Sequence, residues 1–215
     1  MKNLTEIVFI LDCSGSMAGL EGDTIGGFNS LIAKQKKEDG QALVSTVLFN
    51  DKITVLHDRI SLENIGPMTE SDYFVHGCTA LLDAAGGTIN HIKTIHKYLP
   101  EKELPHKTIF IITTDGLENS SRYYTYTKLK DMIEKQKAEY GWQFIFLGAN
   151  IDAIDVANKF GIEKDYAANY HCDKQGTVLN YEVLDCAISQ IRSKKGNLSA
   201  DWKSKIDDDF KRRKK

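Results

Sequence analysis

No stretch of the 215-residue sequence approaches the ~20 consecutive apolar residues that a membrane-spanning helix needs. The first residues, Met1 to Glu6, contain no apolar signal region and no cleavage site, so we expect a cytoplasmic protein without a membrane segment. A formal net charge of −2 gives no general attraction to nucleic acid and argues against such a partner. The four cysteines lack the short spacings of a zinc site or a disulfide framework, and we expect reduced thiols.

The sequence also lacks an obvious linker, a repeat and a low-complexity tract, and its 41% hydrophobic content suffices for one α/β domain. Two apolar runs joined at Asn50-Asp51 predict a hairpin. Elsewhere strands alternate with helices, which predicts a doubly wound, mostly parallel sheet with one antiparallel edge strand and helices on both faces. We predict strands at 7–11, 42–49, 52–57, 107–113, 142–147 and 166–170, and helices at 21–37, 81–98, 125–140, 152–160 and 178–192.

The most informative run of residues is Asp12-Cys13-Ser14-Gly15-Ser16, which follows the apolar strand 7–11. Its carboxylate and two hydroxyls stand at alternate positions, and oxygen is the ligand that hard divalent cations prefer. Thr79 and Asp115 carry the same kind of oxygen, and Asp115 also follows an apolar run, Ile109 to Ile112. Because parallel sheets bind ligands at the carboxyl ends of their strands, these three segments predict one metal site.

This pattern resembles the metal-ion-dependent adhesion site (MIDAS) of the von Willebrand factor A domains, in which an Asp-x-Ser-x-Ser run is followed by a Thr and then an Asp. The resemblance extends over most of the chain and implies a Rossmann-like fold. It implies that Ser14, Ser16 and Thr79 bind the metal directly, while Asp12 and Asp115 support it through bound water.

We expect the metal to be Mg²⁺, with Mn²⁺ or Ca²⁺ possible. Three neutral hydroxyls donate little charge, so the ion stays strongly electrophilic, and octahedral geometry leaves a position for an incoming ligand. The resemblance implies that this ligand is a Glu or Asp carboxylate of a partner protein. Some intracellular relatives work beside ATPases of the AAA class, so such a complex is a possible partner. The sequence therefore predicts a metal-dependent protein-binding module.

The loop after Asp115 is the leading candidate for partner contacts. Arg122, Tyr123 and Tyr124 belong to residue types that are enriched at interaction hot spots. An equally weighted alternative is that some of these tyrosines pack the next helix against the sheet. Glu118, in the same loop, is expected to be a solvated charge.

Enzyme motifs are missing as well. The sequence contains no Gly-x-x-x-x-Gly-Lys-Ser/Thr loop, no His-Glu-x-x-His helix and no Gly-x-Ser-x-Gly elbow. A phosphatase of the haloacid dehalogenase type needs a second Asp two residues after the first, where this chain has Ser14. We therefore predict that the protein is not an enzyme. The alternative is a metal-dependent hydrolase of phosphoesters, in which the ion activates a water.

The end of the sequence is strongly charged. Five basic residues, Lys211 to Lys215, follow Asp207-Asp208-Asp209, whose negative charge weakens their field. We predict a von Willebrand factor A-like domain over residues 1–195 and a charged C-terminal tail over residues 196–215, in which the basic run Lys211 to Lys215 is frayed and solvated.

Overall fold

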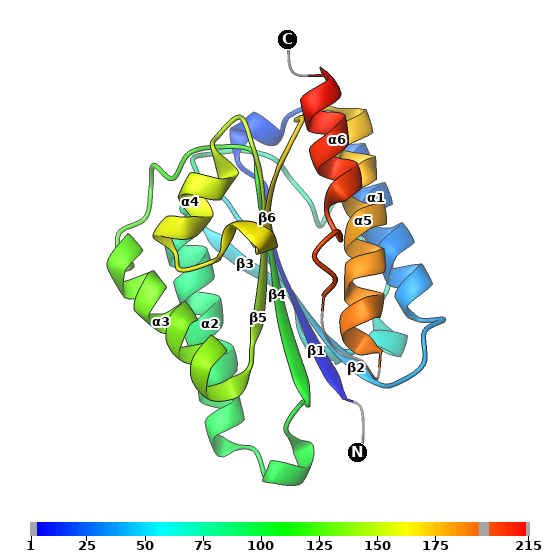
Figure 1. Cartoon of the computed structure of the whole chain (residues 1–215), viewed down its shortest axis with the longest axis vertical. Helices are drawn as coiled ribbons and strands as arrows, with labels where there is room; N and C mark the ends of the chain where they lie inside the picture. Colours follow the sequence, from blue (N-terminus) through cyan, green and yellow to red (C-terminus); the bar gives the residue numbers. More distant parts are fainter. Residues whose placement is uncertain (1–3, 194–197, 214–215) are drawn as a thin grey trace.

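Six strands form the centre of the molecule, and the computed structural model describes residues 4–193 and 198–213. The strand order is β3-β2-β1-β4-β5-β6, and helices cover both faces of the sheet (Figure 1). Every residue of the central strand β1 is buried, because strands flank it and helices cover it. The strands are β1 (Thr5–Asp12), β2 (Ala42–Phe49), β3 (Ile53–Ser61), β4 (Lys107–Thr114), β5 (Gln143–Ala149) and β6 (Ala167–Tyr170).

The pairing of neighbouring strands is parallel except between β2 and β3. The hairpin that joins these two strands turns at Asn50, whose Oδ1 accepts a hydrogen bond from the backbone N–H of Lys52 at 2.7 Å. β3 continues to Ser61, beyond the predicted end at His57, after an irregularity in its register with β2. The predicted doubly wound, mostly parallel sheet with one antiparallel edge strand is confirmed.

The helices divide between the two faces of the sheet. In Figure 1, α1, α5 and α6 cover one face, and α2, α3 and α4 cover the other. Side chains on each face of the sheet form a separate apolar cluster with the helices that cover it. The helices are α1 (Glu21–Gln35), α2 (Leu81–Tyr98), α3 (Tyr126–Tyr140), α4 (Ala153–Lys159), α5 (Lys174–Arg192) and α6 (Ser204–Arg213).

Helix α5 begins four residues before the predicted start at Val178. Asp173 caps it, since its carboxylate accepts a hydrogen bond from the backbone N–H of Gly176 at 2.8 Å. None of the helices in the described part of the chain combines the length and the apolar character that crossing a bilayer requires.

The charged segment contains a helix, α6, that the sequence did not predict, and the prediction of a frayed end is wrong for residues 211–213, which belong to α6, although Lys211 and Arg212 are exposed. Trp202 and Ile206 are buried, and the indole Nε1–H of Trp202 donates to the carbonyl of Asp165 at 2.7 Å. Apolar residues within the charged segment therefore place α6 on the domain rather than in solvent. The predicted domain boundary between residues 195 and 196 lies outside the described residues, as do Lys214 and Lys215.

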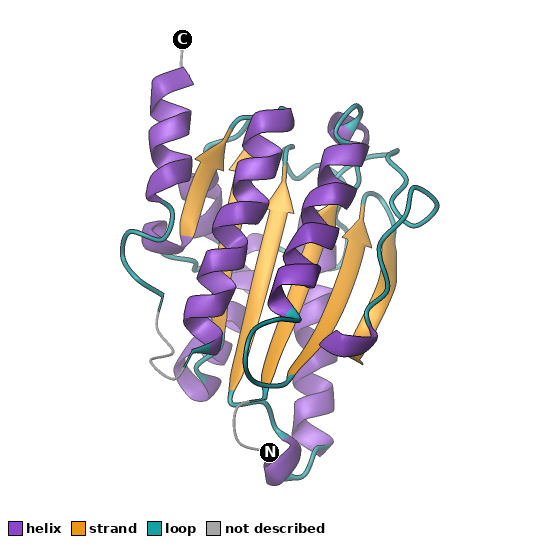
Figure 2. Ribbon diagram, turned by 90° about the vertical axis from the view of Figure 1, so that its right-hand side faces the viewer, coloured by secondary structure: helices purple, strands orange, loops and turns teal. Residues whose placement is uncertain are grey.

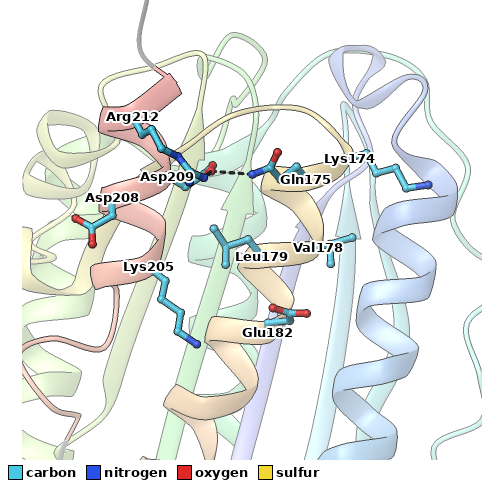
Figure 3. Close-up of a pocket in the computed structure, with 9 residues that line it drawn as sticks. All are labelled: Lys174, Gln175, Val178, Leu179, Glu182, Lys205, Asp208, Asp209 and Arg212. Atoms are coloured by element: carbon cyan, nitrogen blue, oxygen red, sulfur yellow. Dashed lines mark hydrogen bonds and ion pairs between the residues drawn. The ribbon is translucent and has the colours of Figure 1, made fainter.

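Figure 3 shows how α6 lies beside α5. Asp209 of α6 accepts a hydrogen bond from Gln175 of α5 at 2.9 Å, and a groove of about 790 Å³ separates the two helices below this bond. Val178 and Leu179 form the apolar part of the groove, and charged side chains of both signs surround it. None of the predicted site residues lines this groove.

Candidate metal centre

The predicted metal loop lies where β1 ends. The carboxyl ends of the parallel strands meet at one edge of the sheet (Figure 2), so Asp12 and Thr114, the last residues of β1 and β4, lie together. The hydroxyl of Thr114 donates to Oδ2 of Asp12 at 2.5 Å, and the backbone N–H of Ser14 donates to Oδ1 at 2.7 Å. The strand pairing therefore fixes the orientation of the Asp12 carboxylate.

Ser16 and Asp115, two further predicted residues, are linked to Ser14 by hydrogen bonds between hydroxyls and a carboxylate. The hydroxyls of Ser14 and Ser16 lie 3.1 Å apart, and the Ser16 hydroxyl donates to Oδ1 of Asp115 at 2.5 Å. Ser16 is exposed, whereas Ser14 and Asp115 are buried. One exposed hydroxyl above buried oxygens gives the site an opening to solvent.

Thr79 reaches the same site through a different loop. The backbone N–H of Gly15 donates to the carbonyl of Gly77 at 3.1 Å, which joins the two loops. A Cβ atom added at Gly116 would lie 3.3 Å from both the Ser16 Oγ and the Thr79 Oγ1. These two hydroxyls therefore face the same small space, which only a residue without a side chain leaves open.

Asn119 holds Thr79 in place, a role that the sequence did not reveal. The side-chain Oδ1 of Asn119 accepts a hydrogen bond from the backbone N–H of Thr79 at 2.9 Å. The backbone N–H of Asn119 donates to the Thr79 carbonyl at 3.1 Å. Both the N–H and the carbonyl of Thr79 are thus bound by the same residue, Asn119. It fixes the loop on which the Thr79 hydroxyl stands.

The electrostatics of the site favour a cation. Burial raises the pKa of Asp12 above its ordinary value, and the hydrogen bonds from Ser14 and Thr114 oppose this only in part. The charge of Asp115 raises the pKa of Asp12 further. Among the described residues, no group of three or more His, Cys, Asp or Glu side chains is arranged to hold a metal ion. A metal at this site therefore depends on the hydroxyls as well as on the two carboxylates.

The residues present fit a hard divalent cation. Hydroxyl and carboxylate oxygens from three loops converge, and Gly116 leaves a space between the Ser16 and Thr79 hydroxyls that a Cβ atom would fill. The structure thus brings together all five residues that the sequence predicted, Asp12, Ser14, Ser16, Thr79 and Asp115. Their role as metal ligands stays a prediction.

Cys172 is a neighbour of the site that sequence reasoning missed. Its thiol donates to Oδ2 of Asp115 at 3.3 Å from the loop between β6 and α5. Burial and the charge of Asp115 raise the pKa of this thiol to about 12, so it remains protonated at neutral pH. No spacing in the sequence signals this contact, because 57 residues separate the two side chains.

The predicted partner residues divide into two groups. Arg122 and Tyr123 are exposed, and Tyr123 is 77% exposed. Tyr124 instead packs on α2, where a Cβ atom at Gly86 would lie 2.2 Å from the ring, and its other side carries the Lys128 ammonium at 4.2 Å. Tyr124 therefore packs inward, as the alternative prediction expects of some of these tyrosines, but its ring contacts α2, the helix before the loop.

The prediction that Glu118 is a solvated charge is wrong. Its carboxylate accepts hydrogen bonds from the backbone N–H groups of Leu82, Ser120 and Ser121 at 2.8–2.9 Å. The N–H of Leu82 lies in the first turn of α2, where backbone N–H groups lack helical partners, and the bonds from Ser120 and Ser121 hold the loop itself.

Asp83 completes this attachment from the helix side. Its carboxylate accepts hydrogen bonds from the backbone N–H groups of Arg122, Tyr123 and Tyr124 at 2.7–2.9 Å. These three bonds, the bond from Leu82 to Glu118 and a bond from the backbone N–H of Asp83 to the Ser121 hydroxyl at 3.0 Å tie the loop to the start of α2. The exposed side chains of Arg122 and Tyr123 therefore stand on a rigid loop.

Comparisons with known proteins establish the fold but no close relative. No family model and no curated protein matches the chain. Solved structures do match. Proximal thread matrix protein 1 from the mussel byssus, with a zinc-occupied MIDAS motif, is 15% identical at a TM-score of 0.58, over 86% of this chain and 46% of that one.

Two other solved structures are similar. A von Willebrand factor type A structure from Catenulispora acidiphila is 15% identical at a TM-score of 0.53, over 85% of this chain and 42% of that one. The manganese-loaded TRAP protein of Plasmodium vivax is 16% identical at a TM-score of 0.55, over 82% of this chain and 72% of that one. The chain spans less than half the length of the mussel and Catenulispora proteins. The sheet order, the helix layers and these neighbours together show that the chain has the fold of the von Willebrand factor type A domains.

Proposed function

We propose that this protein binds one divalent cation, Mg²⁺ under cellular conditions, and uses it to hold a Glu or Asp carboxylate of a partner protein. The observation that carries the proposal is the convergence of three loops around Gly116, where hydroxyls meet two buried carboxylates. The zinc in the MIDAS of one structural neighbour and the manganese in another support a divalent metal at the corresponding edge of the fold.

The proposed roles of the residues follow from their positions. The hydroxyls of Ser14, Ser16 and Thr79 hold the metal, and the carboxylates of Asp12 and Asp115 orient the hydroxyls and supply negative charge from behind them. When bound, the metal supplies an electrophilic centre for one carboxylate oxygen of the partner. Thr114 and Asn119 keep the carboxylate of Asp12 and the backbone of Thr79 in place.

Exposed apolar side chains near the metal loops support a protein partner. Phe74 is 68% exposed on the loop that leads to Thr79, and Leu117 is 63% exposed two residues after Asp115. Together with Tyr123 they give an apolar rim to a polar centre. Such a combination favours a partner in which an acidic residue is flanked by apolar side chains.

Binding is a better proposal than hydrolysis for this site. In the described part of the chain, the groups that contact the two carboxylates are hydroxyls, backbone N–H groups and the protonated thiol of Cys172. A hydrolase needs a general base within reach of its water, and a histidine would be the usual choice. We therefore propose a module without catalytic activity.

The predicted cytoplasmic location and an AAA ATPase complex as partner are part of the same proposal.

The test is a quantitative pull-down with three samples: wild type in Mg²⁺, wild type in chelator, and Thr79→Ala in Mg²⁺. Thr127→Ala, at an exposed position of α3, is the matched control. A protein captured by wild type and Thr127→Ala in Mg²⁺, but at least tenfold less in the other two samples, supports the proposal. Equal capture in all samples, with all variants folded, contradicts it. Metal-dependent turnover of a phosphoester that Thr79→Ala abolishes would establish the hydrolase instead.

A further inference from the structure

A second candidate binding site lies at the opposite end of the sheet from the metal loops. It is a recess of about 180 Å³ between the ends of α2 and α3 and the segments that lead into β4 and β5. Since α2 precedes β4 and α3 precedes β5, these segments gather at the amino ends of the parallel strands, the lower edge in Figures 1 and 2. Its lining includes Lys93, His96, Lys97, Leu104, Tyr140 and Trp142.

The wall of this recess is apolar and rigid. Trp142 is 5% exposed and stacks on Phe110 of the sheet, with ring centroids 5.2 Å apart. The ring of His96 meets Trp142 edge-on at 5.3 Å, and Leu104 stands half-buried nearby. Tyr140, 61% exposed, forms the outer rim. The recess is therefore a formed hollow whose inner wall is part of the core.

The charged side chains that line the recess have one sign. Lys93 and Lys97 stand exposed one turn apart on α2, and neither forms an ion pair within residues 4–193 and 198–213. No carboxylate lines the recess. His96 contacts the carboxylate of Glu6, but Glu6 is fully buried and also binds the Arg59 guanidinium at 2.6 Å. The exposed charged side chains that line the recess are thus both cations, while the exposed carboxylates nearest in sequence, Glu103 and Glu139, lie beside the lining and not in it.

We propose that this recess binds an acidic segment of a partner protein. One apolar side chain of the segment enters the recess against Trp142 and Leu104, and two carboxylates beside it pair with Lys93 and Lys97. The volume suits a single ring or branched side chain, since a cavity of about 150 Å³ holds benzene. A peptide is favoured over a small molecule because the two lysines are exposed and stand one turn apart along α2, where an extended chain reaches both.

The site does not depend on the metal loops, which lie at the other end of β1 and β4. The test is therefore carried out in chelator. Random peptides displayed on phage are selected on the full chain, and the variant Lys93→Glu/Lys97→Glu is used for counter-selection. Enriched peptides are synthesised and titrated into the wild type, the double variant and Lys52→Glu/Lys211→Glu, which changes the net charge equally at two other exposed positions.

The binding site is located by the indole N–H resonances of the two tryptophans in ¹⁵N-labelled protein. We expect enriched peptides that carry one Leu, Phe or Trp flanked by at least two acidic residues. Their affinity for Lys93→Glu/Lys97→Glu should be at least tenfold weaker than for the control variant. The indole resonance of Trp142 should shift on binding, and that of Trp202 should not. Failure to enrich such peptides, equal affinity for both double variants, or a shift confined to Trp202 would overturn the proposal. Binding unchanged in Thr79→Ala separates this result from the metal site.

Discussion

Two buried carboxylates stand at opposite ends of strand β1, and their partners differ in charge. Glu6, 0% exposed, binds the guanidinium of Arg59 and the ring of His96. Asp12, 1% exposed, accepts hydrogen bonds from the backbone N–H of Ser14 and the hydroxyl of Thr114. The two residues are six positions apart and therefore point to the same face of the sheet.

This difference indicates which of the two buried carboxylates can bind a further cation. The charge of Glu6 is already compensated by Arg59, so that cluster serves the fold. The donors to Asp12 are neutral in the described part of the chain, so its charge is solvated by dipoles but not compensated. The proposed metal at the carboxyl end of β1 would compensate the charge of Asp12, as Arg59 compensates that of Glu6 at the amino end.

The largest effect is expected from Glu6→Ala. This change leaves the largely buried guanidinium of Arg59 without its partner, which costs about 3 kcal/mol of the free energy of unfolding. Urea denaturation in chelator measures the loss. Asp58→Ala, which removes an exposed contact with His91, is the control and should change stability by less than about 1 kcal/mol. A loss for Glu6→Ala as small as that of the control would show that the buried pair is not stabilising.

Asp12→Asn should affect metal binding more than stability. Removing a carboxylate that orients metal ligands lowers metal affinity by about 10–100-fold. In chelator the free energy of unfolding should change by less than about 1.5 kcal/mol, because the lost hydrogen bonds are offset by relief of a buried charge. Calorimetry with Mn²⁺ and urea denaturation give the two quantities. Unchanged Mn²⁺ affinity would contradict the role proposed for Asp12.

The pH dependence of stability in chelator sharpens the same comparison. Burial raises the pKa of Asp12 in the folded state above its ordinary value of 3.8, so the folded protein holds a proton that the unfolded chain has lost. The contribution of Asp12 to stability is therefore favourable at low pH and decreases as the pH rises from about 4 through the raised folded-state pKa. Each unit of the shift is worth about 1.4 kcal/mol. Thermal denaturation of wild type and Asp12→Asn between pH 4 and 8 tests this, and parallel profiles would count against it.

The smallest effect is expected at the surface, where solvent screens a paired carboxylate. Burial alone would raise the pKa of Asp173, but the hydrogen bond and charge of Arg213 outweigh burial and lower it. Stability from this pair is present above the ordinary pKa and is lost as the pH falls through the lower folded-state value. Asp173→Asn, which keeps the oxygen that caps α5 and leaves Arg213 paired with Asp209, should cost about 1 kcal/mol at pH 7 and less below pH 3. Asp208→Asn, at an exposed position of α6, is the matched control, and urea denaturation at the two pH values is the measurement.

Much of the fold could be predicted because its signals are local. An apolar run of strand length, a hairpin turn at Asn50 and helical spacing of apolar residues each act within a few residues. The segments Ala42–Phe49 and Leu81–Tyr98 begin and end where the sequence predicts. The start of α5 was predicted four residues late, because the capping role of Asp173 depends on the direction of its side chain.

The sequence by itself determined the strand alternation and the five oxygen-bearing residues at the ends of strands, since chain direction alone brings those ends to one edge of a parallel sheet. Only the tertiary structure decided which charges are compensated. Glu6 contacts Arg59 and His96, Asp115 contacts Cys172, and Asp83 binds the backbone of residues 122–124, in each case at a sequence separation of 39 or more. Such contacts depend on how helices pack on the two faces and on where side chains point, which no local pattern in the sequence specifies.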